Sequence, residues 1–388
     1  MTLTDDSPIL VPAGLRNVVV TSTELGDVRG GEGFCHYRQY SAVELARTRT
    51  FEDVWFLFLE GRLPTAREAA GFAEEVAPLR TLPDELRDAL PVIAAAGSPL
   101  QGLRTSLSLL AGLRDIAPLW DADPATRRAD ALLVAAITPT LLAALHRLRS
   151  GQEPLEPRAE LSTAANWLHM VTGEVPEADR VSAIERYLVA TVDHGFAAST
   201  FTARVVASTG ADLISAVIAA LGAFSGPLHG GAPDRALAGL DEIGSPDRID
   251  AWVRHKVAAG ERIMGFGHAV YRTDDPRSVM LREVALALGG DLAGFAAAVE
   301  AGVTGALAEL KPERRLYPNV EFYAGVVMEL CGVPRTMFTP TFAVSRIVGW
   351  SAHVLEQATE RRIIRPVARY VGPPAPQPVP VAQAGGAR

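Results

Sequence analysis

The chain has 388 residues, 48% of them apolar, and a formal net charge of -8, as expected of a mildly acidic globular protein. Its length suits two domains, or one large core with an inserted lobe. A negative net charge without a long run of Lys or Arg excludes a general nucleic-acid-binding function, although a local basic pocket for a small anion is compatible with it.

The chain predicts few strands and many helices. Residues 17–23 have the composition of a strand, and a small hairpin is expected near residues 34–40. Further along, Gly61 provides a helix stop, and Thr65 with Glu68 forms a capping box. Apolar residues recur with helical spacing at 51–60, 86–96, 103–113, 125–149, 178–208, 213–224, 248–259, 277–288, 319–330 and 342–358. The predicted fold class is therefore mainly α.

Other features bear on the location in the cell. The longest apolar run, residues 131–145, is interrupted around Pro139, so we expect a kinked, buried helix and no membrane span. The N-terminal segment MTLTDDSPIL lacks the layout of a secretory signal, which favours the cytoplasm. Cys35 and Cys331 have no CxxC motif or Cys/His cluster beside them. We interpret them as buried thiols in a reducing compartment, with catalysis or metal binding as the less favoured alternative.

Glycine and proline gather in three loops, at residues 225–233, 260–267 and 311–318, and residues 371–388 have the composition of a flexible tail. The sequence contains no P-loop, GxGxxG, HExxH or GxSxG motif, which disfavours nucleotide hydrolases, dinucleotide enzymes, zinc proteases and serine hydrolases. The chemistry is therefore sought in and beside the three loops.

Two histidines lie in or next to these loops. Two glycines and a helical run follow His229, so a helix N-terminus can keep the imidazole neutral and able to donate a hydrogen bond to a developing enolate. The alternative is a helix-capping histidine. His268 has glycines before it and Arg272 and Arg277 after it, which suits an anionic ligand. The alternative is a turn whose charges are solvated.

Glu321 is expected at the start of a helix, where a carboxylate is commonly only a favourable partner of the helix dipole. Structural roles, either facing solvent or hydrogen-bonded, are expected for His36, His146, His169 and His255.

Six separated blocks together resemble the citrate synthase family, over residues 14–372. The blocks are HGFAASTFTARVVAST at 194–209, SGPLHGGA at 225–232, MGFGHAVYRTDDPR at 264–277, YPNVEFYAG at 317–325, SRIVGWSAHVLEQ at 345–357 and IIRPVARYVGP at 363–373.

The resemblance implies a mainly helical homodimer with the active site in a cleft between two domains. We expect a large domain from residues 1–230 and 331–370, and a smaller mobile domain from residues 231–330. The substrates implied are oxaloacetate and an acyl-CoA, and the family needs no metal or other cofactor.

The resemblance also implies roles for individual residues. Glu321 would remove a methyl proton from acetyl-CoA, His229 would stabilise the enolate, and His268 would polarise the oxaloacetate carbonyl. The residues implied to contact oxaloacetate are His194, Arg277, Arg346 and Arg365, the last from the partner subunit. Candidates for the CoA phosphates, with a solvated surface as the alternative, are Arg272, Lys311, Arg314 and Arg315.

Two positions depart from the family pattern. The usual base is Asp, and Glu321 is one methylene longer. Since a misplacement near 1 Å can cost on the order of a hundredfold in rate, the helix or the substrate must shift to compensate. Ala197 stands where the family usually has Asn, so a polar contact in the site is lost.

The expected function is that of a citrate synthase, an acyltransferase that makes citrate and CoA from acetyl-CoA, oxaloacetate and water. A 2-methylcitrate synthase, which takes propionyl-CoA, is one alternative, because an apolar pocket discriminates a methylene by only about 1–3 kcal/mol. A non-catalytic paralogue that binds CoA or a partner protein is another, suggested by Glu321 and Ala197. The histidines and arginines of the site argue against it.

Overall fold

The computed structural model describes residues 8–227, 229–230, 232–268, 270–313 and 316–379. They belong to two compact units, Thr23–Arg362 and Met1–Ser22 with Ile363–Arg388. In its described part, the smaller unit contains one 3-10 turn, η1 (Ala13–Leu15), and otherwise irregular backbone. The other elements lie in the larger unit.

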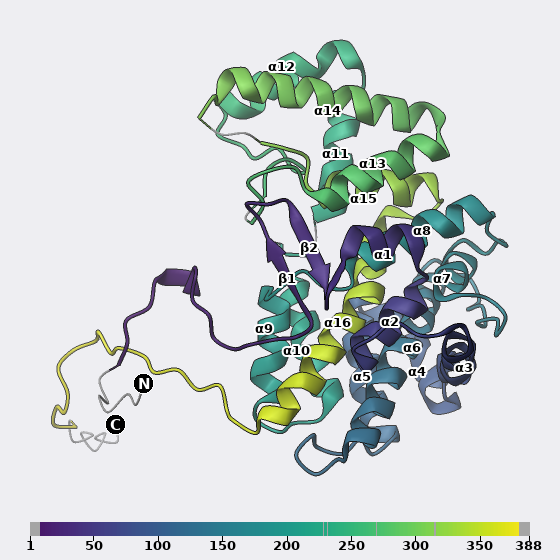
Figure 1. Ribbon diagram of the computed structural model, residues 1–388, viewed down its shortest axis with the longest axis vertical. Helices are drawn as coiled ribbons and strands as arrows, with labels where there is room; N and C mark the ends of the chain where they lie inside the picture. Colours follow the sequence, from purple (N-terminus) through teal and green to yellow (C-terminus); the bar gives the residue numbers. More distant parts are fainter. Residues whose placement is uncertain (1–7, 228, 231, 269, 314–315, 380–388) are drawn as a thin grey trace, which may run out of the picture. The chain divides into compact units, whose positions relative to one another are not determined.

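The larger unit is built from helices and one small antiparallel sheet (Figure 1). The sheet consists of β1 (Gly26–Arg29), β2 (Phe34–Tyr37) and β3 (Tyr40–Ser41), in that order. The helices are α1 (Ala42–Thr48), α2 (Phe51–Glu60), α3 (Ala66–Val76), α4 (Asp84–Ala96), α5 (Pro99–Leu113), α6 (Pro124–Arg149), α7 (Thr163–Thr172), α8 (Ala178–Thr191), α9 (Ala198–Ala207), α10 (Leu213–Phe224), α11 (Ala232–Ile243), α12 (Ile249–Ala258), α13 (Pro276–Leu288), α14 (Gly290–Leu310), α15 (Val320–Leu330) and α16 (Phe338–Glu360). Short 3-10 turns are η2 (Ala77–Arg80), η3 (Pro246–Arg248) and η4 (Arg335–Met337).

Local sequence signals set several helix boundaries. Helices α2, α3 and α5 begin with capping boxes, whose N-cap residues are Thr50, Thr65 and Ser98. Gly61 ends α2 with a left-handed φ of 76°. The expected helix at 51–60, its glycine stop and the capping box at Thr65 are confirmed, as is the mainly helical fold class.

The core is organised around α16, which packs against α6, α8, α9 and α10. Most of its residues as far as Ala358 are buried. Helix α6 is also buried and continues unbroken through Pro139. Cys35 and Cys331 are free thiols, each 2% exposed, so their expected burial is confirmed.

Two helices, α6 and α14, have the length and mean hydropathy of a membrane-spanning segment. In α6, 78% of the apolar window is buried inside the protein, so core packing accounts for its hydropathy. In α14 the share is 33%, and its buried residues form a stripe that packs on α12 and α13. The stripe consists of Ala293, Ala296, Val299, Val303, Ala306 and Leu307.

The strand expected at residues 17–23 is absent, so that prediction was wrong. Val19 is 87% exposed, and no neighbouring backbone in the described chain pairs with this segment. A β-branched run forms a strand only where a partner supplies the hydrogen bonds. The expected hairpin is present as β2 and β3, with β1 as a third strand.

Residues 178–208, expected to be one helical stretch, form two helices, α8 and α9. Between them Gly195 adopts a φ of 60°, which a right-handed helix cannot accommodate. The apolar residues keep their helical spacing across this break, so the spacing does not predict it. Because of the break, His194 lies between the two helices. Helix α14 was not predicted because its alanine-rich sequence has a weak apolar pattern, and α1 and α7 were also missed.

Helices α11 to α15 form a group in which α11 and α13 pack on α15 and α12 packs on α14 (Figure 1). The group corresponds to the residues of the expected small domain. The division into a large domain and a mobile small domain stays a prediction.

Candidate active site

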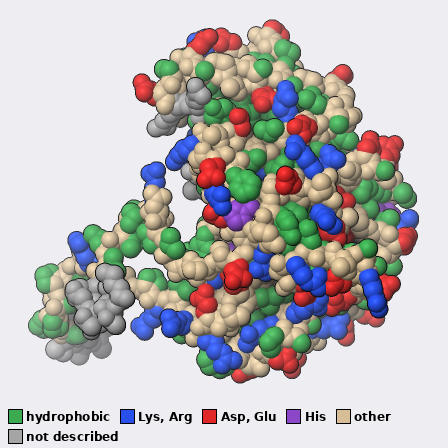
Figure 2. Space-filling model, in the orientation of Figure 1, with side chains coloured by type: hydrophobic (Ala, Val, Ile, Leu, Met, Phe, Trp, Pro, Cys, Tyr) green, Lys and Arg blue, Asp and Glu red, His purple; other side chains and the backbone are tan. Residues whose placement is uncertain are grey.

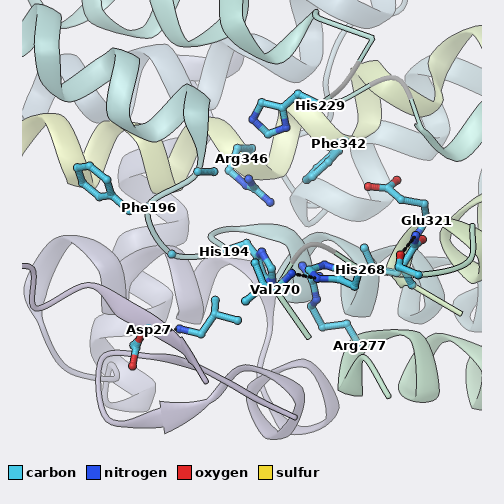
Figure 3. Close-up of a pocket in the computed structure, with 16 residues that line it drawn as sticks. Asp27, His194, Phe196, His229, His268, Val270, Arg277, Glu321, Phe342 and Arg346 are labelled. Atoms are coloured by element: carbon cyan, nitrogen blue, oxygen red, sulfur yellow. Dashed lines mark hydrogen bonds between the residues drawn. The ribbon is translucent and has the colours of Figure 1, made fainter. Parts of the chain in front are cut away.

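A cavity of about 500 Å³ lies inside the larger unit and is lined by six of the expected site residues (Figure 3). They are His194, His229, His268, Arg277, Glu321 and Arg346. The rest of the wall consists of Asp27, Val28, Gly195, Phe196, Ala197, Gly267, Val270, Asn319, Val320 and Phe342. Figure 2 shows histidine side chains in the middle of one face, whereas charged side chains of both signs are scattered over the rest of it.

The other expected residues lie elsewhere. Arg272 lines an adjoining cavity of about 520 Å³, which also contacts His268. Lys311 is the half-buried C-cap of α14 and is not part of the described wall of either cavity. Arg365 is exposed in the smaller unit. Arg314 and Arg315 lie outside the described residues.

Arg277 is held by a buried carboxylate at the start of α13. Oδ1 of Asp275 accepts hydrogen bonds from N and Nε of Arg277, both at 3.0 Å, and Oδ2 accepts one from Nη2 at 2.8 Å. Burial opposes the charge of Arg277, but Asp275 raises its pKa, so the guanidinium is a permanent cation. Oδ2 of Asp275 also accepts a bond from Val320 N at 3.2 Å, which ties Arg277 to the helix that carries Glu321.

Asn319 fixes the position of Glu321 at the start of α15. Its Oδ1 accepts a hydrogen bond from Glu321 N at 3.1 Å, and its Nδ2 donates to Gly267 O at 2.9 Å. The His268 loop and the Glu321 helix are thereby joined. Burial raises the pKa of Glu321 to about 7, although the arginines of the cavity oppose the rise. Such a carboxylate is suited to accept a proton near neutral pH.

His268 presents a single N–H group to the cavity. The backbone N–H group of Val270 donates to its Nδ1 at 2.9 Å (Figure 3), and that of Tyr271 donates to the same nitrogen at 3.0 Å. Because this nitrogen accepts hydrogen bonds, we assign the proton to Nε2. Burial and Arg277 lower the pKa of His268 to about 4, so the ring is a neutral donor at pH 7.

His229 is oriented by two side chains that sequence reasoning did not identify. Trp350 Nε1 donates to Ser199 Oγ at 3.1 Å, and Ser199 Oγ lies 2.8 Å from His229 Nε2. Because the serine oxygen accepts from the indole, we assign its own hydrogen to the bond with Nε2, which leaves the imidazole proton on Nδ1. Burial and Arg346 lower the pKa of His229 to about 4. Ser199 and Trp350 lie in two of the blocks that resemble the citrate synthase family, and this was the one sequence signal that could have marked them as functional.

His194 stands on a buried turn with further unpredicted supports. Asp193 Oδ2 accepts a hydrogen bond from Gly195 N at 3.1 Å. Asp193 Oδ1 lies 3.3 Å from His353 Nε2. A Cβ added at Gly349 on α16 would meet the carbonyl oxygen of Val192 at 2.2 Å, so only glycine permits this packing. Burial and nearby arginines lower the pKa of His194 well below its usual value, so the ring is neutral.

Arg346 brings a second buried charge into the cavity. It is 2% exposed, and its Nε donates to Thr191 O at 2.8 Å. Within the part of the chain that the structure describes, it forms no ion pair. Its guanidinium lies 4.6 Å from the centre of the Phe342 ring, and burial lowers its pKa. An arginine in this position is available to a ligand anion.

The β1–β2 hairpin forms one side of the cavity through Asp27 and Val28. A Cβ added at Gly30 would lie 2.2 Å from the carbonyl oxygen of Val270, so a glycine is needed for this approach. The Arg272 N–H also donates to Gly30 O at 2.8 Å, so the hairpin packs directly on the segment of residues 270–272. The hairpin expected near residues 34–40 is β2–β3, whereas β1 and its place at the cavity were not predicted.

Ala197 is the N-cap of α9 and makes no side-chain capping bond. It also lies in the cavity wall. N-cap positions usually carry Ser, Thr, Asp or Asn, whose side chains accept a bond from the first turn. The departure from the family pattern at this position thus removes both a helix cap and a polar group from the wall.

The cavity combines a carboxylate of raised pKa, imidazoles that each hold one N–H hydrogen, and two buried guanidinium groups. Such a set can take a proton from carbon, stabilise the resulting enolate by hydrogen bonds and hold a dicarboxylate. Among the described residues, no group of three or more His, Cys, Asp or Glu side chains is placed to hold a metal ion.

A sequence model described as "Citrate synthase, C-terminal domain" matches residues 14–367. The chain belongs to the citrate synthase family. The citrate synthase of Deinococcus radiodurans is 38% identical over 364 residues, which cover 93% of this chain and 96% of that protein. The 2-methylcitrate synthase of Mycobacterium tuberculosis is 39% identical over 370 residues, which cover 93% of this chain and 91% of that protein.

A solved structure of the citrate synthase from Thermoplasma acidophilum, in a ternary complex with carboxymethyl coenzyme A and oxaloacetate, superposes with a TM-score of 0.85. It is 30% identical and covers 94% of this chain and 97% of that one. The expected family, the citrate-synthase-like helical fold and the enzyme class, an acyltransferase, are confirmed.

Proposed function

We propose that this member of the citrate synthase family condenses acetyl-CoA with oxaloacetate and hydrolyses the citryl thioester to citrate and CoA. The observation that carries the proposal is the convergence of Glu321, His229 and His268 on one cavity that also contains two buried arginines. The oxaloacetate and coenzyme A analogue in the complex of the Thermoplasma acidophilum relative support these substrates.

The reaction begins with removal of a proton from the methyl carbon of acetyl-CoA by the Glu321 carboxylate. The electron pair moves to the thioester oxygen, which accepts a hydrogen bond from Nδ1–H of His229. The enolate carbon then attacks the ketone carbon of oxaloacetate. The ketone oxygen, hydrogen-bonded by Nε2–H of His268, takes up the electron pair and a proton equivalent to the one on Glu321, which returns to its carboxylate form. Water finally cleaves the citryl thioester into citrate and CoA.

The two carboxylates of oxaloacetate require fixed cations. Arg277 and Arg346 supply two, and His194 adds a neutral donor. We propose that the chain forms a homodimer in which Arg365 of a second copy supplies a third. Arg272, in the adjoining cavity, is the candidate for a CoA phosphate. Further candidates are Lys311, Arg314 and Arg315.

A cytoplasmic location and a mobile small domain belong to the same proposal. The buried free thiols of Cys35 and Cys331 support a reducing compartment. The reaction has no redox step, and the acyl group arrives already activated as a thioester, so we propose that no cofactor is needed.

Synthesis of 2-methylcitrate from propionyl-CoA is the second candidate function. The Mycobacterium tuberculosis relative of that name, 39% identical, favours it. One methylene is discriminated by about 1–3 kcal/mol, so the same catalytic side chains can serve either thioester.

Release of free CoA in the presence of oxaloacetate separates these functions. We expect kcat/KM for acetyl-CoA to exceed that for propionyl-CoA by about 10- to 200-fold. A higher kcat/KM with propionyl-CoA would assign the second function, and no release from either thioester would contradict both. Omitting oxaloacetate, as the control, should abolish release.

The rate is expected to rise with pH through about 7. Glu321 acts as a base only when deprotonated, and burial raises its pKa to about 7. The imidazoles of His229 and His268, with pKa values lowered to about 4, stay neutral in this range. His194, whose pKa burial lowers well below its usual value, also stays neutral. Cys35, whose pKa burial raises to about 12, stays protonated. A plot of log kcat/KM against pH should therefore rise with unit slope and level off above about pH 7. A flat profile would contradict Glu321 as the base.

A further inference from the structure

Tyr271 is a buried phenol that the mechanism above does not use, yet it touches three groups that the mechanism does use. It is 4% exposed. Its ring centre lies 4.7 Å from that of His268 and 5.5 Å from that of His194, and Cζ of Arg277 lies 5.8 Å from it. The two imidazole rings are 5.4 Å apart. Tyr271 therefore joins substrate-facing side chains from two separate segments of the chain.

The hydroxyl group of Tyr271 lies between an imidazole and a thiol. Its oxygen is 3.3 Å from Nε2 of His194. It also interacts with the thiol of Cys35, which lies on β2. His194 is neutral, so its ring holds a single N–H hydrogen, and the hydroxyl contact decides which nitrogen carries it.

The direction of the hydrogen bond follows from the available donors and acceptors. An unprotonated imidazole nitrogen is a stronger acceptor than a thiol sulfur, so the single phenol hydrogen is directed to His194. Burial raises the pKa of Cys35 to about 12, so the thiol keeps its hydrogen and its sulfur is only a weak acceptor for the phenol. Burial also raises the pKa of Tyr271, which stays protonated. Nε2 of His194 is then the acceptor, and its proton lies on Nδ1.

The backbone of the same residue acts on the second imidazole. Tyr271 N donates to Nδ1 of His268 at 3.0 Å, which leaves the His268 proton on Nε2. Tyr271 thus acts on two neighbouring histidines: on His194 through its side chain and, together with the Val270 N–H group, on His268 through its main chain.

We propose that Tyr271 is a positioning residue for oxaloacetate, because its hydroxyl holds His194 in the tautomer with the proton on Nδ1 and its ring orients His194 against His268. This inference rests on the proposed function, in which His194 contacts oxaloacetate. A donor that is fixed before the substrate arrives needs no reorganisation when it binds.

Tyr271→Phe removes the hydroxyl and keeps the ring. We expect the Kd for oxaloacetate, measured by calorimetry without a thioester, to rise about tenfold, because a hydrogen bond contributes at most about this factor. At saturating oxaloacetate, kcat should stay within about threefold of the wild type. Tyr323→Phe is the matched control, since it loses a phenol hydrogen bond to Glu300 outside the cavity and should change neither value. An unchanged Kd in Tyr271→Phe would overturn the proposal.

Nitrogen-15 NMR of histidine-labelled protein reads the tautomer directly. In the wild type, His194 should show a protonated Nδ1 and an unprotonated Nε2, with its signals assigned by their loss in His194→Gln. In Tyr271→Phe the Nε2 signal should shift, and the Tyr323→Phe spectrum should not change. A wild-type His194 protonated on Nε2 would overturn the proposal even if Tyr271→Phe fails to fold. Neither the calorimetric Kd nor the NMR spectrum depends on turnover, so a wild type that releases no CoA would contradict the proposed function without deciding the role of Tyr271.

Discussion

Glu321→Gln is expected to lower kcat by about 10²- to 10⁴-fold and to leave the Kd for oxaloacetate within about threefold of the wild type. Glutamine keeps the shape of the side chain but cannot take a proton from carbon. At the start of α15, backbone N–H groups donate hydrogen bonds to the side chains of Asn319 and Asp275, and the substitution does not remove these bonds. CoA release and calorimetric titration with oxaloacetate measure the two quantities. Wild-type kcat in this variant would exclude Glu321 as the base.

Glu185→Gln is the matched control for this prediction. Burial raises the pKa of Glu185 to about 7, as it does for Glu321. Glu185 accepts a hydrogen bond from Phe51 N at 3.2 Å and is not part of the described cavity wall. We expect its substitution to leave kcat and the pH profile unchanged. If kcat falls only in the Glu321 variant, the fall can be attributed to loss of the base. It cannot then be a general effect of placing a neutral amide in the protein interior.

The residues that face the cavity could be predicted because each is marked by its own local sequence. His229 and His268 lie beside glycines in the loops that connect helices, and Glu321 opens a helix after a proline-containing turn. Their roles came from the order of the family-like blocks. Helical periodicity alone places the three segments on different helices and does not bring them together.

The side chains that hold these residues could not be predicted in the same way. The pair of Asp193 and His353 spans 160 residues, and the pair of Ser199 and Trp350 spans 151. A hydrogen bond between such distant residues leaves no local pattern, because spacing rules describe neighbours on one helix or strand. The role of Tyr271 was not predicted for the same reason, because its partner Cys35 lies far away in the sequence, on strand β2.

The errors in the predicted fold also have local causes. The apolar pattern of residues 178–208 is helical throughout, but Gly195 takes a left-handed conformation and ends that regularity. A single glycine in a helical pattern is often tolerated, so its conformation depends on its surroundings. Here the Gly195 N–H donates to Asp193, two residues earlier, and the Asp193 carboxylate in turn lies 3.3 Å from His353 on α16. Capped helices such as α2 were located well because their end signals are encoded within four residues.

Arg346→Met is expected to raise the Kd for oxaloacetate by on the order of 10²- to 10³-fold, because losing one partner of a buried, hydrogen-bonded charge pair costs about 2–5 kcal/mol. The free energy of unfolding should not fall. In the described chain Arg346 makes no ion pair, and its Nε bond goes to the carbonyl oxygen of Thr191. Methionine keeps apolar volume against Phe342 without a buried charge, and replacing buried charges with apolar groups is often neutral or stabilising.

Arg80→Met is the matched comparison, because Arg80 is buried too but has a carboxylate partner. Its Nη2 lies 3.2 Å from Glu52 Oε1, and its Nη1 donates to Leu161 O at 2.8 Å. Removing it leaves Glu52 as an unpaired charge in the interior, so the free energy of unfolding should fall by ~3–5 kcal/mol, with the affinity of the folded protein for oxaloacetate unchanged. Denaturant unfolding and calorimetry measure both quantities for both variants. The reverse pattern, in which Arg346→Met loses stability and keeps wild-type affinity, would make Arg346 a structural residue and leave Arg277 as the one buried cation proposed for the substrate.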